Sequence, residues 1–479
     1  MLQLTRGTAA RIRDGLGAGA GWGRDTPITE LTGEVTHTRN ANSPLSTGRS
    51  SLIPIPCNLP FPTLLLVNNS RPAPRRMPIS TLPLALPSLL LEADALAPQL
   101  IAWRRHLHMY PEQAFNEHET SRFIRDTLAS IDGLELSRPT DTSVMARLIG
   151  EQPGRTIAVR ADIDALPIHE EHESEYRSRI DGSMHACGHD GHTAIVLGLV
   201  TLLARHRDAL CGEVRFLFQH AEELSPGGAE QMVAQGVMDG VDQVIGLHLW
   251  STMPVGKIGL ISGAAMAAPD TFQCHILGRG GHAAAPHETV DPIAVGAQVV
   301  SALQHIVSRA VDPLDNVVVS VTQFVAGTTF NVIPGSAYLS GTVRTFDEAL
   351  RTRVPQLIER MIKGVTDANG ATYNLSFERG YRPVVNDPAL TARLSAVVTR
   401  TFGDGVLEPM RPTMGGEDFS AYQQKAPGVF AFVGAGNVDT GIEYPHHHPR
   451  FQIDERALSI GLRYLAAATL DLLQQTPTD

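Results

Sequence analysis

The sequence is poor in cysteine, in long apolar runs and in positive charge. Its 479 residues include four cysteines, Cys57, Cys187, Cys211 and Cys274, too few for a disulfide framework, so we expect a reducing, cytoplasmic location. The sequence contains no apolar run of the roughly 18 residues that a membrane-spanning helix needs, so we expect no membrane partner. Lys and Arg number 39 against 50 Asp and Glu, a net charge of -11, which argues against a nucleic-acid partner.

The first part of the chain differs in composition from the rest. Residues 1 to about 80 mix Gly, Ser, Thr, Asn, Pro and Arg without a sustained period, and the prolines between 54 and 62 prevent a regular element there. We expect residues 1–85 to be an unstructured or non-homologous extension. Three arginines and no acid within the first 13 residues suggest a transit peptide. We favour the alternative of a disordered or wrongly translated extension, with Met77 as the true start.

From about residue 86 onward, strand and helix patterns alternate. Strands predicted at 156–159, 213–218 and 243–247 are followed by polar residues, and helices are predicted at 89–106, 116–130, 193–206 and 229–235. This alternation predicts an α/β fold with a mostly parallel sheet and helices on both faces. In such folds the site lies just past the carboxyl ends of the strands. We assign 86–267 and 382–479, which carries further helices at 388–401 and 455–474, to this catalytic domain.

Residues 268–381 show a different order of predicted strands and helices. The expected elements are strands at 271–277, 316–325, 336–346 and 372–377, with helices at 292–310 and 348–369. The order βαββαβ is that of a ferredoxin-like unit. We therefore expect a compact lid or dimerisation domain inserted into the first domain.

The stretch from His185 to His192 is the strongest candidate for a metal site. Cys187 and His189 stand two residues apart on a glycine-containing turn that leads into an apolar helix. Thiolate and imidazole both bind divalent transition metals. The alternative is a buried structural cysteine beside surface histidines.

Other polar residues follow predicted strands. Glu222 and Glu223 end a strand, where a turn can direct both carboxylates into one cleft, so that one binds metal while the other moves a proton. A solvated acidic pair is the alternative. His248 follows the next strand and is a candidate ligand or a structural histidine. Arg344 ends a strand of the lid and suits a carboxylate clamp, or is a surface arginine.

Three further stretches are rich in histidine or glycine. His446 to His448 lie between Tyr-Pro and Pro-Arg-Phe, which indicates an ordered loop. His169 to Glu173 we interpret as a solvated charged turn, because the spacing does not fit the metalloprotease helix. Gly278 to Ala283 lacks the context of a phosphate-binding loop.

Between about Leu91 and Leu473 the chain resembles the dinuclear metallo-aminoacylase and carboxypeptidase family. It is most similar to the amidohydrolase branch of hippurate, auxin-conjugate and N-acetyldiaminopimelate hydrolases. The motifs that carry the resemblance occur in one order: RADIDALPI from Arg160, MHACGHDGH from Met184, AEE from Ala221, GLH from Gly246, GRGGHAAAPH from Gly278, NVIP from Asn331, GTVRTF from Gly341, GGEDFS from Gly415 and HHPRF from His447.

The resemblance implies two divalent metal ions per chain, Mn²⁺, Zn²⁺, Co²⁺ or Ni²⁺, with Cys187 as the ligand that bridges them. It implies Glu222 as general base and Asp164 as a carboxylate that orients the bridging site. The other implied ligands are His189, Glu223, His248 and His447. His282 is implied to be a lid histidine that reaches a partner subunit's site and stabilises the oxyanion. Asn331 and Arg344 are implied to hold the substrate's carboxylate. Gly415 and Gly416 are implied to form a wall of the substrate pocket.

Two positions depart from the family pattern, His220 in place of proline and Gly416 in place of serine. Both are expected near the pocket, where they would affect substrate preference. The implied function is that of a metal-dependent amidohydrolase that cleaves N-acyl-L-amino acids. We expect a homodimer formed through the lid, or a tetramer. The alternatives are a dipeptidase or carboxypeptidase of the same fold and a non-catalytic small-molecule-binding homologue.

Overall fold

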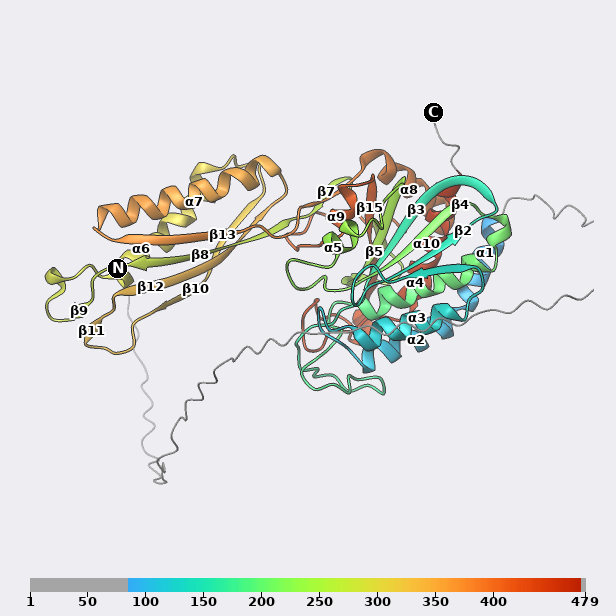
Figure 1. The fold of residues 1–479 in the computed structure, drawn as a ribbon, viewed down its shortest axis with the longest axis horizontal. Coiled ribbons are helices and arrows are strands. Elements are labelled where there is room, and N and C mark those ends of the chain that lie inside the picture. The colour runs from blue at the N-terminus through green and yellow to red at the C-terminus, as the bar shows by residue number, and fades with distance from the viewer. Residues whose placement is uncertain (1–84, 475–479) are drawn as a thin grey trace, which may run out of the picture. The chain divides into compact units, whose positions relative to one another are not determined.

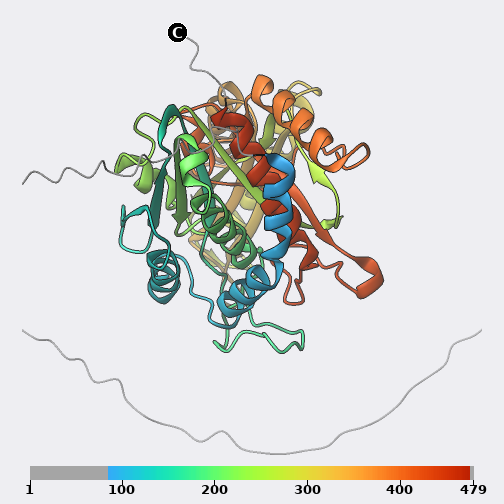
Figure 2. The ribbon, with the colours of Figure 1, turned by 90° about the vertical axis from the view of Figure 1, so that its right-hand side faces the viewer.

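The computed structural model describes residues 85–474 of the chain (Figures 1 and 2). The expectations for the N-terminal extension, including Met77 and Cys57, lie outside these residues. None of the described helices is long and apolar enough to cross a membrane.

A seven-stranded sheet organises the larger part of the described chain. Its order is β1-β2-β4-β3-β5-β15-β6, and β4, β3, β5 and β15 run parallel while β1, β2 and β6 pair antiparallel at the two sides. The strands are β1 (Leu134–Ser137), β2 (Val144–Ile149), β3 (Gln152–Asp162), β4 (Cys211–Gln219), β5 (Gln243–Pro254), β6 (Ile258–Gly259) and β15 (Gly428–Gly436). The predicted sheet is confirmed, although β15, buried throughout, was not predicted.

Helices cover both faces of this sheet because its strands are apolar on both sides. Val429, Ala431 and Val433 of β15 pack into one hydrophobic cluster, and the alternate Phe430 and Phe432 pack into a second cluster on the opposite face. In Figure 2, α1 and α10 lie side by side over the first cluster. The helices are α1 (Leu86–Ala95), α2 (Ala97–Met109), α3 (His118–Ala129), α4 (His189–Ala204), α5 (Ala229–Ala234), α8 (Pro388–Phe402), α9 (Ser420–Gln423) and α10 (Arg456–Leu473).

The inserted segment forms a four-stranded antiparallel sheet in the order β10-β12-β8-β13, with α6 and α7 packed on it (Figure 1). The elements are β8 (Ala268–Leu277), α6 (Pro292–His305), β10 (Val317–Ala326), β12 (Ser336–Thr345), α7 (Glu348–Ala368) and β13 (Thr372–Glu378). Two small sheets pair β9 (Gly281–His282) with β11 (Val332–Ile333) and β7 (Gly263–Met266) with β14 (Val384–Asn386). The predicted βαββαβ order is present; the limits 268 and 381 remain a prediction.

Three parallel strands deliver the candidate site residues to one edge of the large sheet. Asp162 ends β3, and Glu222 follows the end of β4. The expectation that His248 follows a strand is wrong, because β5 continues to Pro254. The pairing of β3 with β5 nevertheless stops at Gly246, so His248 emerges beside the end of β3.

Candidate functional site

A cavity of about 750 Å³ opens at this edge of the sheet. It is lined by residues of the large sheet's loops and by the base of the lid strands. Eight of the predicted residues line it: Cys187, Glu222, Glu223, His248, Arg344, Gly415, Gly416 and His447. His189 lies just beneath the surface of the cavity and is 1% exposed.

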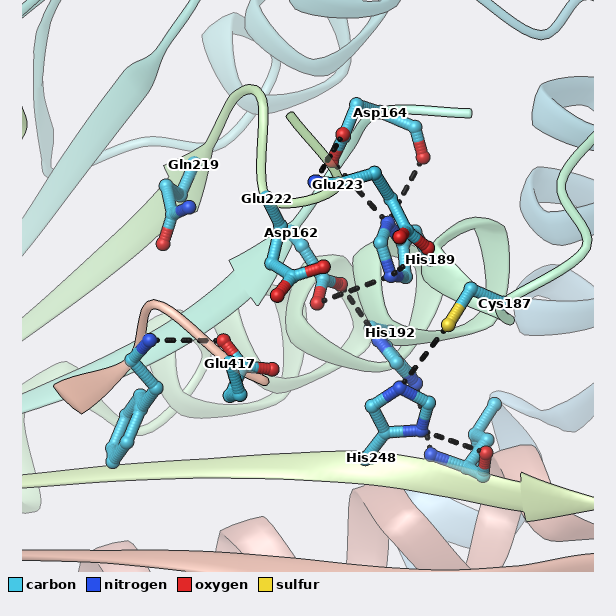
Figure 3. A network of polar contacts seen from close by, with 12 residues as sticks. Asp162, Asp164, Cys187, His189, His192, Gln219, Glu222, Glu223, His248 and Glu417 are labelled. Atoms are coloured by element: carbon cyan, nitrogen blue, oxygen red, sulfur yellow. Dashed lines mark hydrogen bonds and ion pairs between the residues drawn. The ribbon is translucent and has the colours of Figure 1, made fainter. Parts of the chain in front are cut away.

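The Cys187 thiol stands between two sets of possible ligands. Its Sγ, with nitrogens of His189 and His248, forms one group whose atoms all lie within 4.8 Å of one another. The same sulfur forms a second such group with Glu223 and His447. Sγ is 3.4 Å from Nε2 of His248 (Figure 3). One sulfur shared by two ligand sets is the arrangement that a bridging ligand requires.

Backbone carbonyls fix how the imidazoles are presented. Nδ1 of His189 donates to the carbonyl oxygen of Asp164 at 2.9 Å, and Nδ1 of His248 donates to that of Leu249 at 2.9 Å. Because a carbonyl only accepts, Nδ1 carries a proton, and Nε2 is the nitrogen that a metal can bind once the ring is neutral. Nε2 of His447 lies 3.0 Å from Oε1 of Glu223. The ring nitrogens available for metal therefore converge on Cys187 and Glu223.

Unusual backbone angles place the site residues. Gly188, with φ of 94°, turns the chain between Cys187 and the first residue of α4. Ala221 and His447 are non-glycine residues with positive φ of 49° and 64°. The turn at Ala221 breaks the strand alternation, so Glu222 and Glu223 both line the cavity, as predicted. Such strained positions are characteristic of functional sites.

Asp164 connects two of the ligands rather than holding the sulfur. Its Oδ2 accepts the backbone N–H of Glu223 at 3.0 Å, and its Oδ1 lies 3.3 Å from Nδ1 of His189. These contacts orient His189 and the turn at Glu223. That Asp164 orients the bridging site stays a prediction.

A buried guanidinium sits behind the proton-transfer candidate. Arg160, 1% exposed, donates to Asp162, Glu417 and Asp418 at 2.8 to 2.9 Å. One positive charge cannot balance three carboxylates and the nearby Glu222. Burial and the Glu417 carboxylate accordingly raise the pKa of Glu222 well above its usual value.

The ligand set holds protons that a cation would displace. Burial, followed by the carboxylates of Glu223 and Glu222, raises the pKa of the Cys187 thiol well above its usual value. Burial works against protonation of His189, but Asp162 and then Asp164 raise the pKa of its ring to about 10. Both shifts report an excess of buried negative charge.

The donor set fits divalent metal. Two buried atoms at the centre make no hydrogen bond with the described residues: His189 Nε2 and Glu223 Oε1. Buried polar atoms are rarely left unpaired unless an ion or water satisfies them. Sulfur, imidazole and carboxylate together suit zinc and its transition-metal neighbours rather than calcium or magnesium.

Four of the twelve predicted residues do not line the cavity: Asp164 and His189, which are buried, and His282 and Asn331, which are not. His282 on β9 and Asn331 before β11 lie next to each other, since the N–H of Ala283 donates to the carbonyl of Asn331 at 3.1 Å, and both are exposed. His220 is also absent from the cavity lining among the described residues, so the departure there does not touch the pocket. Gly416 does line it, and a Cβ at this position would meet Pro269 at 2.6 Å.

Several site residues were missed although their motifs were noticed. Both ring nitrogens of His192 make hydrogen bonds: Nδ1 donates to Asp162 at 2.6 Å, and Nε2 accepts from the N–H of Leu249 at 2.8 Å. Arg160 and Asp162 stand in the RADIDALPI motif, where polar and apolar residues alternate, and Glu417 stands in the GGEDFS motif. Tyr381, whose hydroxyl donates to the carbonyl of Glu222 at 2.7 Å, gave no sequence signal.

The prediction of a solvated turn at 169–173 is wrong for two of its residues. Glu170 is 3% exposed and the His172 side chain 9%, whereas the His169 side chain is 66% exposed. Both side chains lie beside His108 of α2, whose Nε2 is 3.2 Å from Oε1 of Glu170 and whose ring centroid is 6.0 Å from that of His172.

Comparison with known proteins places the chain in a family. Residues 158–471 match peptidase family M20/M25/M40. An N-acyl-L-amino acid amidohydrolase of Geobacillus stearothermophilus is 62% identical over 61% of this chain and 79% of its own length. Thermostable carboxypeptidase 1 of Saccharolobus solfataricus is 39% identical over 76% of this chain and 92% of its own length.

A solved structure gives the same answer. The chain is similar to a dinuclear metal binding peptidase of the M20 family from Bacillus subtilis, with a TM-score of 0.69 and 37% identity, covering 80% of this chain and 99% of that one. The predicted fold, family and enzyme class are thereby confirmed. The chain belongs to peptidase family M20/M25/M40.

Proposed function

We propose that the chain is a metal-dependent amidohydrolase that cleaves N-acyl-L-amino acids to a carboxylate and an amino acid. The family and the 62% identical amidohydrolase confirm that the chain is a hydrolase that acts on amide bonds. The observation that carries the proposal is the Cys187 sulfur, which two ligand sets share beside two carboxylates.

The ligands would divide between two ions. His189 and His248 would hold one, Glu223 and His447 the other, and Cys187 would bridge them. Two bound dications would polarise the amide carbonyl and make a water acidic enough to ionise near neutral pH. Hydrogen bonds from Nδ1 of His189 and His248 hold these rings in the tautomer that binds metal.

Glu222 would move the proton. It lines the cavity and stands outside the two groups that share the sulfur, although its carboxylate also lies within 4.8 Å of ligand atoms of His189 and Glu223. Its raised pKa matches a group that takes a proton and later returns it to the leaving amine. Tyr381 fixes the Glu222 backbone through its hydrogen bond to the carbonyl oxygen. Arg160 and the three carboxylates that it binds lie behind Glu222, and they set the electrostatic environment of its carboxylate.

Arg344 would receive the carboxylate of the substrate. Its side chain lines the cavity, is half-buried, and makes no hydrogen bond or ion pair with any residue in the range 85–474. A guanidinium without a partner in a cavity favours an anionic ligand. The apolar part of the lining, Trp250, Met266 and Met414, would then take the acyl chain.

The test is a hydrolysis screen over N-acetyl, N-benzoyl and indole-acetyl amino acids, with Mn²⁺, Co²⁺, Ni²⁺ and Zn²⁺ supplied separately. Glu222→Gln should lower kcat about 10²–10⁴-fold without loss of bound metal. The exposed Glu230→Gln is the matched control and should retain full activity. Full activity of Glu222→Gln would remove this residue from its role. Cleavage of free dipeptides but of no N-acyl amino acid would favour the carboxypeptidase alternative, which the 39% identical relative supports.

We further propose a homodimer formed through the lid. Strand β10 is an edge of its sheet and exposes Phe324 and Val325, 40% and 62%. An exposed apolar edge strand is a template for pairing with a second copy. Because His282 does not line the cavity of its own chain, a partner's lid would have to supply it.

Subunit complementation tests this arrangement. Glu222→Gln and His282→Ala should each be inactive alone. An equimolar mixture that exchanges subunits should regain about a quarter of wild-type activity, because about half of the dimers are hybrids and one of the two sites in each hybrid is intact. Val325→Arg should yield monomers by light scattering, whereas Val385→Arg, at a similarly exposed valine outside the lid, should remain dimeric. Absence of recovery from stable hybrid dimers would show that His282 is not supplied across the interface.

A further inference from the structure

A second cluster of metal-binding side chains lies outside the cavity. His108 on α2 and Glu170 and His172 on the turn before α4 each offer an atom within 4.8 Å of the others. His108 is fully buried, Glu170 is 3% exposed, and only the His172 side chain, 9% exposed, reaches the surface. None of the three lines the cavity of the proposed hydrolase site.

His108 is held in the manner of a metal ligand. Its Nδ1 lies 2.8 Å from Oδ2 of Asp190, which is itself 2.8 Å from Nε of Arg104. A carboxylate at one ring nitrogen is the usual support for an imidazole that binds metal through the other. The second nitrogen, Nε2, faces Oε1 of Glu170 at 3.2 Å.

His172 completes the set. Its Nε2 lies 2.7 Å from Oε1 of Glu170, yet the oxygen is off the N–H direction and the nitrogen makes no hydrogen bond with any described residue. Two ligand atoms of one tetrahedral zinc ion lie about 3.3 Å apart, so Nε2 of His172 would move about 0.6 Å away from Oε1 of Glu170 when the ion binds. Nδ1 of His172 meets the Gln452 amide at 3.1 Å, and that amide can present its oxygen to a protonated Nδ1.

An unsatisfied histidine lies beside these three. His185 is 2% exposed, and neither of its ring nitrogens has a hydrogen-bond partner in residues 85–474. Its ring centroid is 6.4 Å from that of His108. A purely ionic network of His108, Glu170 and Asp190 leaves this ring and Nε2 of His172 unexplained, whereas an ion with a bound water would account for both.

We propose that His108 Nε2, Glu170 Oε1 and His172 Nε2 form a third, structural divalent-metal site of zinc-like preference, separate from the shared-sulfur centre. Water fills the fourth position and donates a hydrogen bond to His185. Two imidazoles and one carboxylate are a known zinc set. The ion ties α2 to the turn that precedes the Cys187 loop, and so fixes the wall behind the catalytic ligands.

Metal content of the full chain tests the site independently of hydrolysis. In the double variant Cys187→Ala with His447→Ala, which lacks the shared-sulfur centre, one zinc per chain should remain by mass spectrometry of the desalted protein. Adding His172→Ala should remove it, and adding His169→Ala, on the exposed face of the same turn, should not. Cobalt in the double variant should give tetrahedral d–d bands without sulfur-to-metal charge transfer.

Stability gives a second readout that does not need the ion to survive purification. Zinc should raise Tm of the double variant by several degrees and leave the His172→Ala triple variant unchanged. In the otherwise native chain, His172→Ala should lower metal content by one ion and leave hydrolysis measurable. The proposal would be overturned if the double variant held no zinc and showed no shift in Tm. It would also be overturned if His172→Ala and His169→Ala left equal metal content. Either result would leave an ionic network in place of the metal site.

Discussion

Replacing Arg160 by methionine should be among the most destabilising single changes in this protein. The side chain makes five hydrogen bonds in the interior, and three of the acceptor residues are the carboxylates of Asp162, Glu417 and Asp418. Methionine fills a similar volume but leaves these carboxylates without a cation. Removing one partner of a buried ionic cluster costs about 3–5 kcal/mol, against a total stability of about 5–15 kcal/mol.

The loss should depend on pH in a defined direction. Burial and the Asp418 carboxylate raise the pKa of Glu417 to about 8 even though Arg160 opposes this, and burial raises the pKa of Asp418 to about 6. Without the guanidinium both values rise further. In both proteins the folded state then binds protons that the unfolded chain releases above about pH 4, so stability falls as pH rises, by at most about 1.4 kcal/mol per pH unit for each proton. The parent stops losing stability at its own pKa values, about 6 and about 8, whereas the variant continues to lose it, so the difference between them grows above about pH 6.

Urea unfolding of the Arg160→Met variant and the parent chain at pH 5, 7 and 9 measures both effects. The control is Arg147→Met, whose half-exposed guanidinium pairs with Glu213 and Glu135 at the surface and should contribute no more than about 1 kcal/mol. A loss below about 1 kcal/mol for Arg160→Met, or a variant that becomes relatively more stable as pH rises, would refute the reasoning.

Three further outcomes follow from the same geometry. His192→Ala should weaken metal binding about 10–100-fold in equilibrium dialysis, because the imidazole orients Asp162 behind the ligands; unchanged affinity would contradict this. Metal affinity should increase with pH, because the pKa of the Cys187 thiol is raised and binding must release its proton; proton release measured by calorimetry in two buffers checks the sign. Tyr381→Phe removes one hydrogen bond to the backbone of Glu222 and should lower stability by about 1 kcal/mol in thermal unfolding, with kcat reduced more than KM is raised.

Local patterns predicted most of the secondary structure and several candidate ligands, and the family resemblance implied the full ligand set. The helix at 348–369 is present as α7 (Glu348–Ala368), and the polar residues after β3 and β4 do converge on one edge of the sheet. Alternation and strand ends are short-range signals, and the parallel order of strands brings their carboxyl ends together without further information. The motif resemblance added the choice of His447 over the histidines beside it. Nε2 of His447 lies 3.0 Å from Oε1 of Glu223.

Long-range partners could not be predicted. The burial of Glu170 depends on His108, which lies 62 positions earlier, so a run of charges looked solvated. Arg160 satisfies carboxylates contributed by a loop more than 250 positions later. The position of His282 outside the cavity depends on how the lid folds as a separate sheet, which the motif alone does not contain.

The central claim is that one sulfur joins two ions. A crystal of the metal-loaded chain, with anomalous data at the absorption edge of the supplied metal, tests it most directly. The account predicts two peaks flanking Cys187, each about 2.3 Å from Sγ if the ion is zinc, one beside His189 and His248 and the other beside Glu223 and His447. A single peak, or two peaks with Sγ bonded to neither, would contradict it.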